Sequence, residues 1–170
     1  MKTILKIQLV FTALTLLSVL NVNAQQEKYL AAFVYQFTNY INWPSNSGEF
    51  VIGVIGSSNV TTYLQQLAKE KKVGSSAIVI KEWGSASEIG SCSIIFIPES
   101  QKSNLASIKS KIENKPILII TESPGLTKNG AGISFVKAEG KIRFDINKTA
   151  ISRTGLVVAN SLERLALNVY

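Results

Sequence analysis

The segment around residues 30–44 combines a helical hydrophobic pattern with an abrupt stop. Pro44 pushes Trp43 away from helical backbone angles, so the helix is predicted to end before Trp43. Six apolar side chains recur at spacings of three and four residues, which is one face of an α-helix. They are Leu30, Phe33, Val34, Phe37, Tyr40 and Ile41. We expect most of this stripe to face a core.

Farther along the chain, short runs that are apolar throughout alternate with segments of helical period. The runs predict strands at Phe50–Gly56, Ala77–Trp83, Ser93–Pro98 and Pro116–Thr121. Helices are predicted between them, from Val60 to Ala68 and from Ser100 to Asn114. Strands that are apolar on both faces and alternate with helices indicate a parallel sheet that is covered on both sides.

The pattern changes after Pro124. Ile133–Val136 and Lys141–Ile146 flank an Ala-Glu-Gly turn and predict a β-hairpin. In the second arm, apolar and polar residues alternate, which gives one buried and one solvent-exposed face. The predicted fold is therefore a three-layer, Rossmann-like α/β domain. Its mixed sheet has about six strands, a C-terminal β-hairpin, and helices on both faces.

Two helices are predicted after the hairpin. Asn147 is placed to cap a short helix that runs through Arg153. The segment Leu156–Val169 then has the spacing of a last helix. On that helix one apolar face is expected to pack on the sheet, formed by Leu162, Leu165, Ala166 and Val169.

The first 24 residues have the pattern of an export signal. Two lysines precede an apolar run over residues 7–20, and the Val-Asn-Ala sequence at 22–24 suits a cleavage site. The apolar run is short for a membrane-spanning helix. We predict cleavage after Ala24, a periplasmic location, and a single domain over residues 25–170. Loss of the two lysines lowers the formal net charge of +7 by two.

The chain is poor in catalytic side chains. It has no His, which excludes imidazole-based triads and imidazole metal sites, and Asp145 is its only Asp. Gly53 and Gly56 lack the third glycine of a dinucleotide fingerprint, although weak anion binding at the following helix start stays an alternative. The basic residues are scattered, which argues against a nucleic-acid partner. We expect no catalytic residue, no metal ligand and no cofactor.

The single cysteine, Cys92, rules out an internal disulfide. It precedes the apolar run SIIFIP, so the sequence predicts a buried and inert thiol that packs as a small hydrophobic side chain.

Four segments, in chain order, resemble the YfiR-like family of bacterial periplasmic proteins. They are the aromatic helix before Trp43-Pro44, the aliphatic strand after Cys92, the strand at Ile117–Glu122 with the following GAGISF, and a closing pattern of Arg143, Phe144, Ile146, Asn147, Ala150, Arg153, Gly155 and Leu156. Ser93 stands where the family usually has His. The structural motif residues that the resemblance assigns are Trp43, Pro44, Cys92, Phe144, Asn147, Arg153, Gly155 and Leu156.

The resemblance implies a periplasmic regulator that represses an inner-membrane diguanylate cyclase, and hence cyclic-di-GMP output and biofilm, by protein contact. The implied partners are the periplasmic domain of that signalling protein and an outer-membrane lipoprotein, with a homodimer also left open. A well-known member has two internal disulfides, which this chain cannot form, so their redox control does not carry over. A small-ligand sensor module that serves a histidine kinase or an uptake system is the alternative.

Tyr and Arg are favoured at interaction hot spots. The candidate partner-binding residues are therefore Tyr29 and Tyr40 on the aromatic helix, Arg143 on the hairpin and Arg164 on the last predicted helix. Internal hydrogen bonds are the alternative role for Arg143 and for Arg153.

Overall fold

The computed structural model describes residues 25–44, 48–113 and 115–170. The predicted export signal lies outside the described residues. The strands are β1 (Ile41–Asn42), β2 (Phe50–Ile55), β3 (Lys72–Val73), β4 (Ser76–Trp83), β5 (Ile94–Ile97), β6 (Leu118–Thr121), β7 (Ile133–Ala138), β8 (Lys141–Ile146) and β9 (Val157–Val158). The helices are an N-terminal helix (residues 25–37), α2 (Val60–Glu70), α3 (Leu105–Lys111), α4 (Lys148–Arg153) and α5 (Asn160–Glu163).

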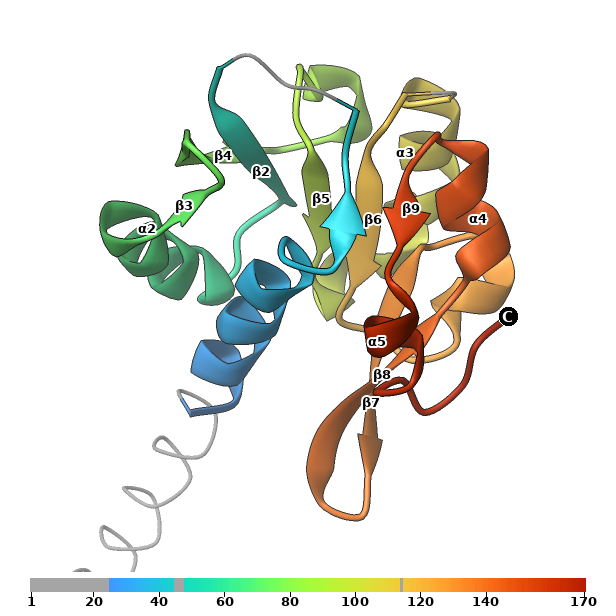
Figure 1. The fold of residues 1–170 in the computed structure, drawn as a ribbon. Helices are drawn as coiled ribbons and strands as arrows, with labels where there is room; N and C mark the ends of the chain where they lie inside the picture. Colours follow the sequence, from blue (N-terminus) through green and yellow to red (C-terminus); the bar gives the residue numbers. More distant parts are fainter. Residues whose placement is uncertain (1–24, 45–47, 114) are drawn as a thin grey trace, which may run out of the picture.

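The central sheet has the strand order β3-β4-β2-β5-β6-β7-β8 (Figure 1). The five strands from β4 to β7 in that order are parallel, and the edge strands β3 and β8 pair antiparallel with their neighbours. This confirms the predicted three-layer α/β fold with a mixed sheet. The sheet has seven strands rather than about six, because the two-residue β3 adds an edge strand. The predicted hairpin is confirmed as β7 and β8.

The two faces of the sheet carry separate apolar cores, because successive side chains of a strand point to opposite faces. On β5, for example, Phe96 joins one core and Ile95 joins the other. The N-terminal helix and α2 cover the first core, while α3 covers the second with Leu105 and Ile108. The strands β2, β5 and β6 are buried along their whole length, as their uniformly apolar sequences predict, whereas β4 is buried only at Ile78.

The predicted helix over Ser100–Asn114 divides in two. A 3-10 segment at Glu99–Asn104 leads into the α-helix α3, which ends at Lys111. Asn114 itself lies outside the described residues.

The prediction of a last helix over Leu156–Val169 is wrong. Val157 and Val158 form β9 and pair with β1, and the only helical turn that follows is α5. The chain then runs along the outer edge of β8, where Leu167 N–H donates to the carbonyl of Phe144 and Ile146 N–H donates to that of Asn168. Backbone pairing with β8 replaces the helical hydrogen bonds of this segment.

The apolar face that was predicted for the last helix is correspondingly broken up. Leu162 is buried in the first core, but Leu165 and Val169 are exposed. Ala166 packs against that core while only partly buried.

Candidate functional site

Four aromatic rings attach the N-terminal helix to the β7–β8 hairpin. Phe37 packs on Phe144 and Phe135 at centroid distances of 5.0 and 5.9 Å. Phe33, one helical turn earlier, lies 5.9 Å from Phe135 and 6.0 Å from Phe144. The helix stripe and the apolar face of the hairpin predicted from the sequence therefore meet each other. Figure 1 shows the end of the β7–β8 hairpin projecting from the rest of the domain.

The two candidate tyrosines lie in different surroundings. Tyr29 is exposed on the N-terminal helix, near the distal part of the hairpin, and its hydroxyl accepts a hydrogen bond from Gln25 Nε2 at 3.3 Å. Tyr40 follows the helix in a turn and is half-buried against the first core. Its carbonyl accepts a hydrogen bond from Ala159 N–H. Of the two, Tyr29 is the side chain that solvent and partners reach more freely.

The two candidate arginines belong to one neighbourhood at the outer edge of β8. Both are exposed. Arg143 Nη2 donates to the carbonyl of Leu165 at 3.5 Å, which places it beside the residue that follows Arg164. In the hairpin Arg143 pairs with Val136, whereas Ile142 pairs with Lys137. Side chains of paired residues share a face, so Arg143 points to the opposite face of the hairpin from Ile142, which borders Tyr29.

Trp43 is half-buried where the first helix leads into the sheet. Its indole Nε1 donates to the carbonyl of Ser93 at 3.2 Å, and its ring meets that of Phe50 edge to face at 5.0 Å. Pro44 beside it is exposed. The contacts of Trp43 are with the first core and the start of β5, and its contribution to stability stays a prediction.

The closing motif residues build the connection from β8 to β9. Asn147 Oδ1 accepts from Ala150 N–H at 2.7 Å, which caps α4, while its Nδ2 donates to the carbonyl of Thr127 at 2.7 Å. Gly155 has a φ of +80°, a value that favours glycine, and it lets the chain leave α4 for the buried Leu156. Arg153 is exposed, and its side chain makes no hydrogen bond or ion pair among the described residues.

Cys92 is half-buried beside the second core, rather than fully buried as the sequence predicted. Burial raises the pKa of its thiol to about 12, although Lys115 and Lys81 act in the opposite direction. At neutral pH the group is therefore an uncharged thiol.

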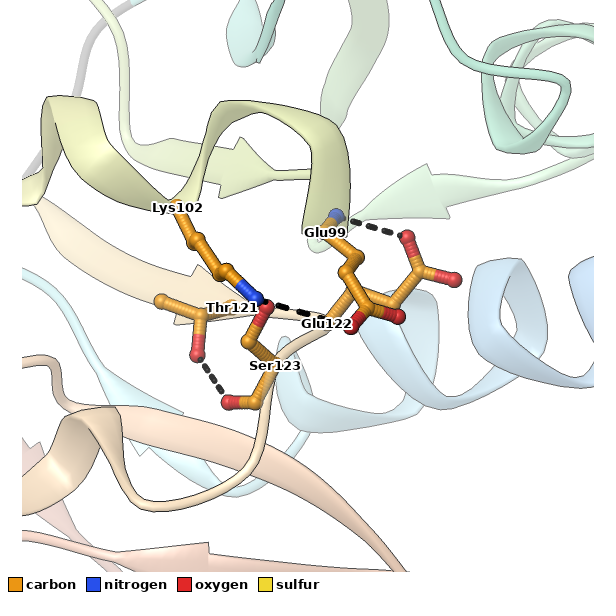
Figure 2. Close-up of polar contacts among 5 residues, drawn as sticks. All are labelled: Glu99, Lys102, Thr121, Glu122 and Ser123. Atoms are coloured by element: carbon orange, nitrogen blue, oxygen red, sulfur yellow. Dashed lines mark hydrogen bonds and ion pairs between the residues drawn. The ribbon is translucent and has the colours of Figure 1, made fainter.

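A polar cluster that the sequence reading missed lies at the carboxyl ends of β5 and β6 (Figure 2). Glu99 N–H donates to Glu122 Oε2 at 3.0 Å, and Thr121 Oγ1 donates to the carbonyl of Ser123 at 3.0 Å. Ser123 is buried, and its hydroxyl has no hydrogen-bond partner among the described residues. The sequence feature that could have predicted this cluster is the run Thr-Glu-Ser at the end of an apolar strand. Ligand sites in parallel sheets lie at the carboxyl ends of the strands.

The search for membrane spans and for metal clusters covers the described residues. None of their helices is long and apolar enough to cross a membrane, and no group of three or more metal-ligating side chains occurs among them.

The fold and the closing motif define a class of three-layer α/β domains with an added hairpin. Residues 27–167 match the YfiR/HmsC-like family, and the chain belongs to that family. This confirms the resemblance seen in the sequence. No curated protein matches the chain.

Among solved structures, the chain is similar to one described as the ABC domain in complex with L-Trp from Streptococcus pneumonia. The TM-score is 0.52 at 14% sequence identity, and the match covers 71% of this chain and 55% of that structure. The chain thus spans about half the length of that protein, and the likeness concerns the fold alone.

Proposed function

We propose that the protein is a periplasmic regulator that represses an inner-membrane signalling enzyme, a diguanylate cyclase, by direct contact with its periplasmic domain. The observation that carries the proposal is the family match over residues 27–167, which includes the aromatic helix, the hairpin and the closing motif. The sequence without His, and with a single Asp, agrees with a regulatory rather than a catalytic role.

The surface proposed for this contact is the exposed side of the N-terminal helix and the hairpin. Tyr29 lies on it, and Arg143 and Arg164 flank the hairpin from its other side. These exposed side chains project from a rigid base, because the rings of Phe33 and Phe37 lock the helix onto β7 and β8. A preorganised surface loses less conformational entropy when it binds a partner.

The test is to express the full chain with a diguanylate cyclase from the same organism that has a periplasmic domain, and to measure cyclic-di-GMP. The matched control is the same chain without residues 1–24, which lacks the predicted export signal. We expect the full chain to lower cyclic-di-GMP and the control without residues 1–24 to leave it unchanged. An unchanged level, with folded protein present in the periplasm, would contradict the proposal.

A second candidate function, a small-ligand sensor module, is favoured by the cleft beside the polar cluster at the strand ends. This cleft of about 360 Å³ is lined by Leu30 and Phe135 and by the side chains of Glu99, Glu122 and Lys137. Its mixed charges suit a zwitterion or an amine with an apolar body. Thermal-shift titration with amino acids and amines, using Glu122→Gln as the site variant, tests it: an unshifted melting temperature across the panel removes this candidate.

A further inference from the structure

The distal half of the hairpin stands clear of the aromatic cluster and ends in a tight turn. Glu139 and Gly140 have φ values of +52° and +71°. Positive φ at both central residues is the signature of a two-residue type I′ turn, whose twist matches that of the flanking strands. The hairpin tip is therefore a regular, well-defined structure, although it extends away from the body of the domain (Figure 1).

The register of the hairpin decides which side chains face the N-terminal helix. Phe135 pairs with Phe144, and both rings lie under the helix. Two residues farther along, Lys137 pairs with Ile142 and lies on the same face. Toward the hairpin tip, the face that the helix covers therefore ends in the side chains of Ile142 and Lys137.

Between this face and the start of the helix lies a hollow of about 560 Å³. Tyr29 and Phe33 line it from the helix, and Ile142 lines it from β8. Tyr29 is 53% exposed, and Ile142 and Phe33 are only half-buried. Three large apolar side chains therefore share an open cavity that nothing in the described structure fills.

The charged side chains that line this hollow are both basic, while Glu139 lies at the hairpin tip between them in the sequence. The charged lining residues are Lys137 and Lys141, and both are exposed. The ion pairs among the described residues join Lys102 to Glu99 and Lys148 to Glu163, so neither lysine of the hollow has an acidic partner there. The hollow thus combines an apolar interior with two lysines, of which Lys137 also borders the cleft that holds Glu99 and Glu122.

We propose that this hollow receives an apolar side chain from an acidic segment of the partner protein. The inference rests on the proposed function, since it names the chemistry of the contact through which the regulator acts. An aliphatic or aromatic anchor fills the space between Tyr29, Phe33 and Ile142, and flanking carboxylates lie against Lys137 and Lys141. Central apolar anchors supply most of the binding energy of such contacts, while peripheral charges steer association and set specificity.

The first experiment measures fluorescence anisotropy of a labelled peptide, Glu-Asp-Gly-Phe-Leu-Gly-Asp-Glu, with the chain over residues 25–170. Two control peptides replace its acidic residues by Lys or its Phe-Leu by Ser-Ser. We expect the acidic apolar peptide to bind at least tenfold more tightly than either control, with an affinity that falls as salt rises. Equal binding of the three peptides, or no binding of the first, would overturn the proposal.

The second experiment locates the binding. A double variant, Lys137→Glu with Lys141→Glu, and the single variant Tyr29→Ala should each weaken peptide binding at least tenfold. The matched control reverses two exposed lysines elsewhere, Lys72→Glu on β3 and Lys111→Glu on α3, and should bind as the wild type does. Since all of these residues are exposed, circular dichroism should show each variant folded. Wild-type affinity in the Lys137 and Lys141 variant would place the peptide elsewhere and refute the hollow.

The cyclic-di-GMP assay separates this inference from the proposed function. If the Lys137 and Lys141 variant loses repression and the lysine control keeps it, the hollow is the contact site. If that variant represses fully, the hollow is not the contact site and the proposed function stands. If the wild type itself does not repress, the proposed function fails, and the peptide experiments alone decide whether the hollow selects acidic apolar segments.

Discussion

The ring of Phe37 stands edge to face on the ring of Phe144, with 5.0 Å between centroids and 72° between planes. Phe37 is in the N-terminal helix and Phe144 is in β8, so the contact joins segments from opposite ends of the described chain. Both side chains are almost completely buried. The contact fixes the position of the helix relative to the hairpin.

A double-mutant cycle with Phe37→Leu and Phe144→Leu measures this contact. Edge-to-face pairs contribute about 0.5–1.5 kcal/mol beyond the area that they bury. We expect each single variant to be destabilised in urea and the double variant to lose less than the sum of the two by about 1 kcal/mol. Strict additivity would show that the two rings do not interact energetically.

Replacement of Trp43 by Ala should destabilise the fold by about 3 kcal/mol, the lower end of the range for large aromatic truncations, because Trp43 is only half-buried. The control Trp43→Phe keeps an aromatic ring beside Phe50 but removes the donor to the carbonyl of Ser93, and should lose less. Urea denaturation measures both. An unchanged free energy of unfolding in the Ala variant would assign Trp43 to the interaction surface instead.

The two hydrogen bonds of Asn147 can be separated by substitution. Asn147→Ser keeps a side-chain oxygen for the cap of α4 but loses the amide that donates to the Thr127 carbonyl, while Asn147→Ala loses both. A lost helix cap costs about 1 kcal/mol, so the Ala variant should be the less stable of the two by about that amount. Equal stability of the variants would mean that the cap contributes nothing.

Gly53 lies in β2 directly below the indole ring of Trp83. A Cβ atom added at Gly53 would lie 1.8 Å from Trp83 Cζ3, so the ring has to move. We expect Gly53→Ala to cost roughly 1–3 kcal/mol through overpacking. The double variant Gly53→Ala with Trp83→Leu tests the cause, because a smaller side chain at position 83 should reduce the penalty of the added methyl group.

Cys92 should react slowly with thiol reagents in the folded protein. Burial raises the pKa of its thiol from 9.0 to about 12. At pH 8 the thiolate fraction is then about a thousandfold lower than in the unfolded chain, since each pKa unit changes it tenfold. Ellman's reagent in native buffer and in urea measures the two rates. Comparable rates would refute an inert thiol.

The same shift has a defined effect on stability. Between pH 9 and about pH 12 the unfolded chain has lost the Cys92 proton that the folded chain still holds, so the free energy of unfolding should fall as pH rises through this window. In the variant Cys92→Ser, the free energy of unfolding should lack this part of its pH dependence. The lysines are common to both proteins and should affect the two stability-against-pH curves alike.

Local patterns predict the sheet well and the last segment badly, for one physical reason. The central strands are apolar on both faces, and this pattern fits only a covered parallel sheet. In the last segment Leu162, Leu165 and Val169 have helical spacing, but Leu165, Leu167 and Val169 are also spaced by two, as in a strand. The backbone hydrogen bonds with β8 favour the extended conformation over the helix. Because β8 is distant in the sequence, a pattern read within the last segment does not predict this pairing.

The candidate site is predictable to a similar extent. The alternation of Ile142, Phe144 and Ile146 in β8 correctly predicts one apolar face. The aromatic helix stripe is correct from Leu30 to Phe37, whereas Tyr40 lies in a turn and Ile41 belongs to β1. Their mutual contact, and the hollow where the helix and the hairpin diverge, follow from the tertiary arrangement. The buried hydroxyl of Ser123 lies in a loop whose depth the sequence does not reveal.

The chain segment that runs along β8 also covers an edge of the sheet on which another copy of the chain could add a strand. A bare strand at the margin of a sheet is a template on which another molecule can add a strand and begin an aggregate. Here the backbone groups of Phe144 and Ile146 that point away from β7 form hydrogen bonds with the backbone of Leu167, Asn168 and Tyr170. Along the rest of β8, Lys141 and Arg143 are exposed and positively charged. At the opposite margin β3 pairs with the first two residues of β4, Ser76 and Ala77. We therefore expect the covered edge of β8 to resist strand addition by another copy of the chain.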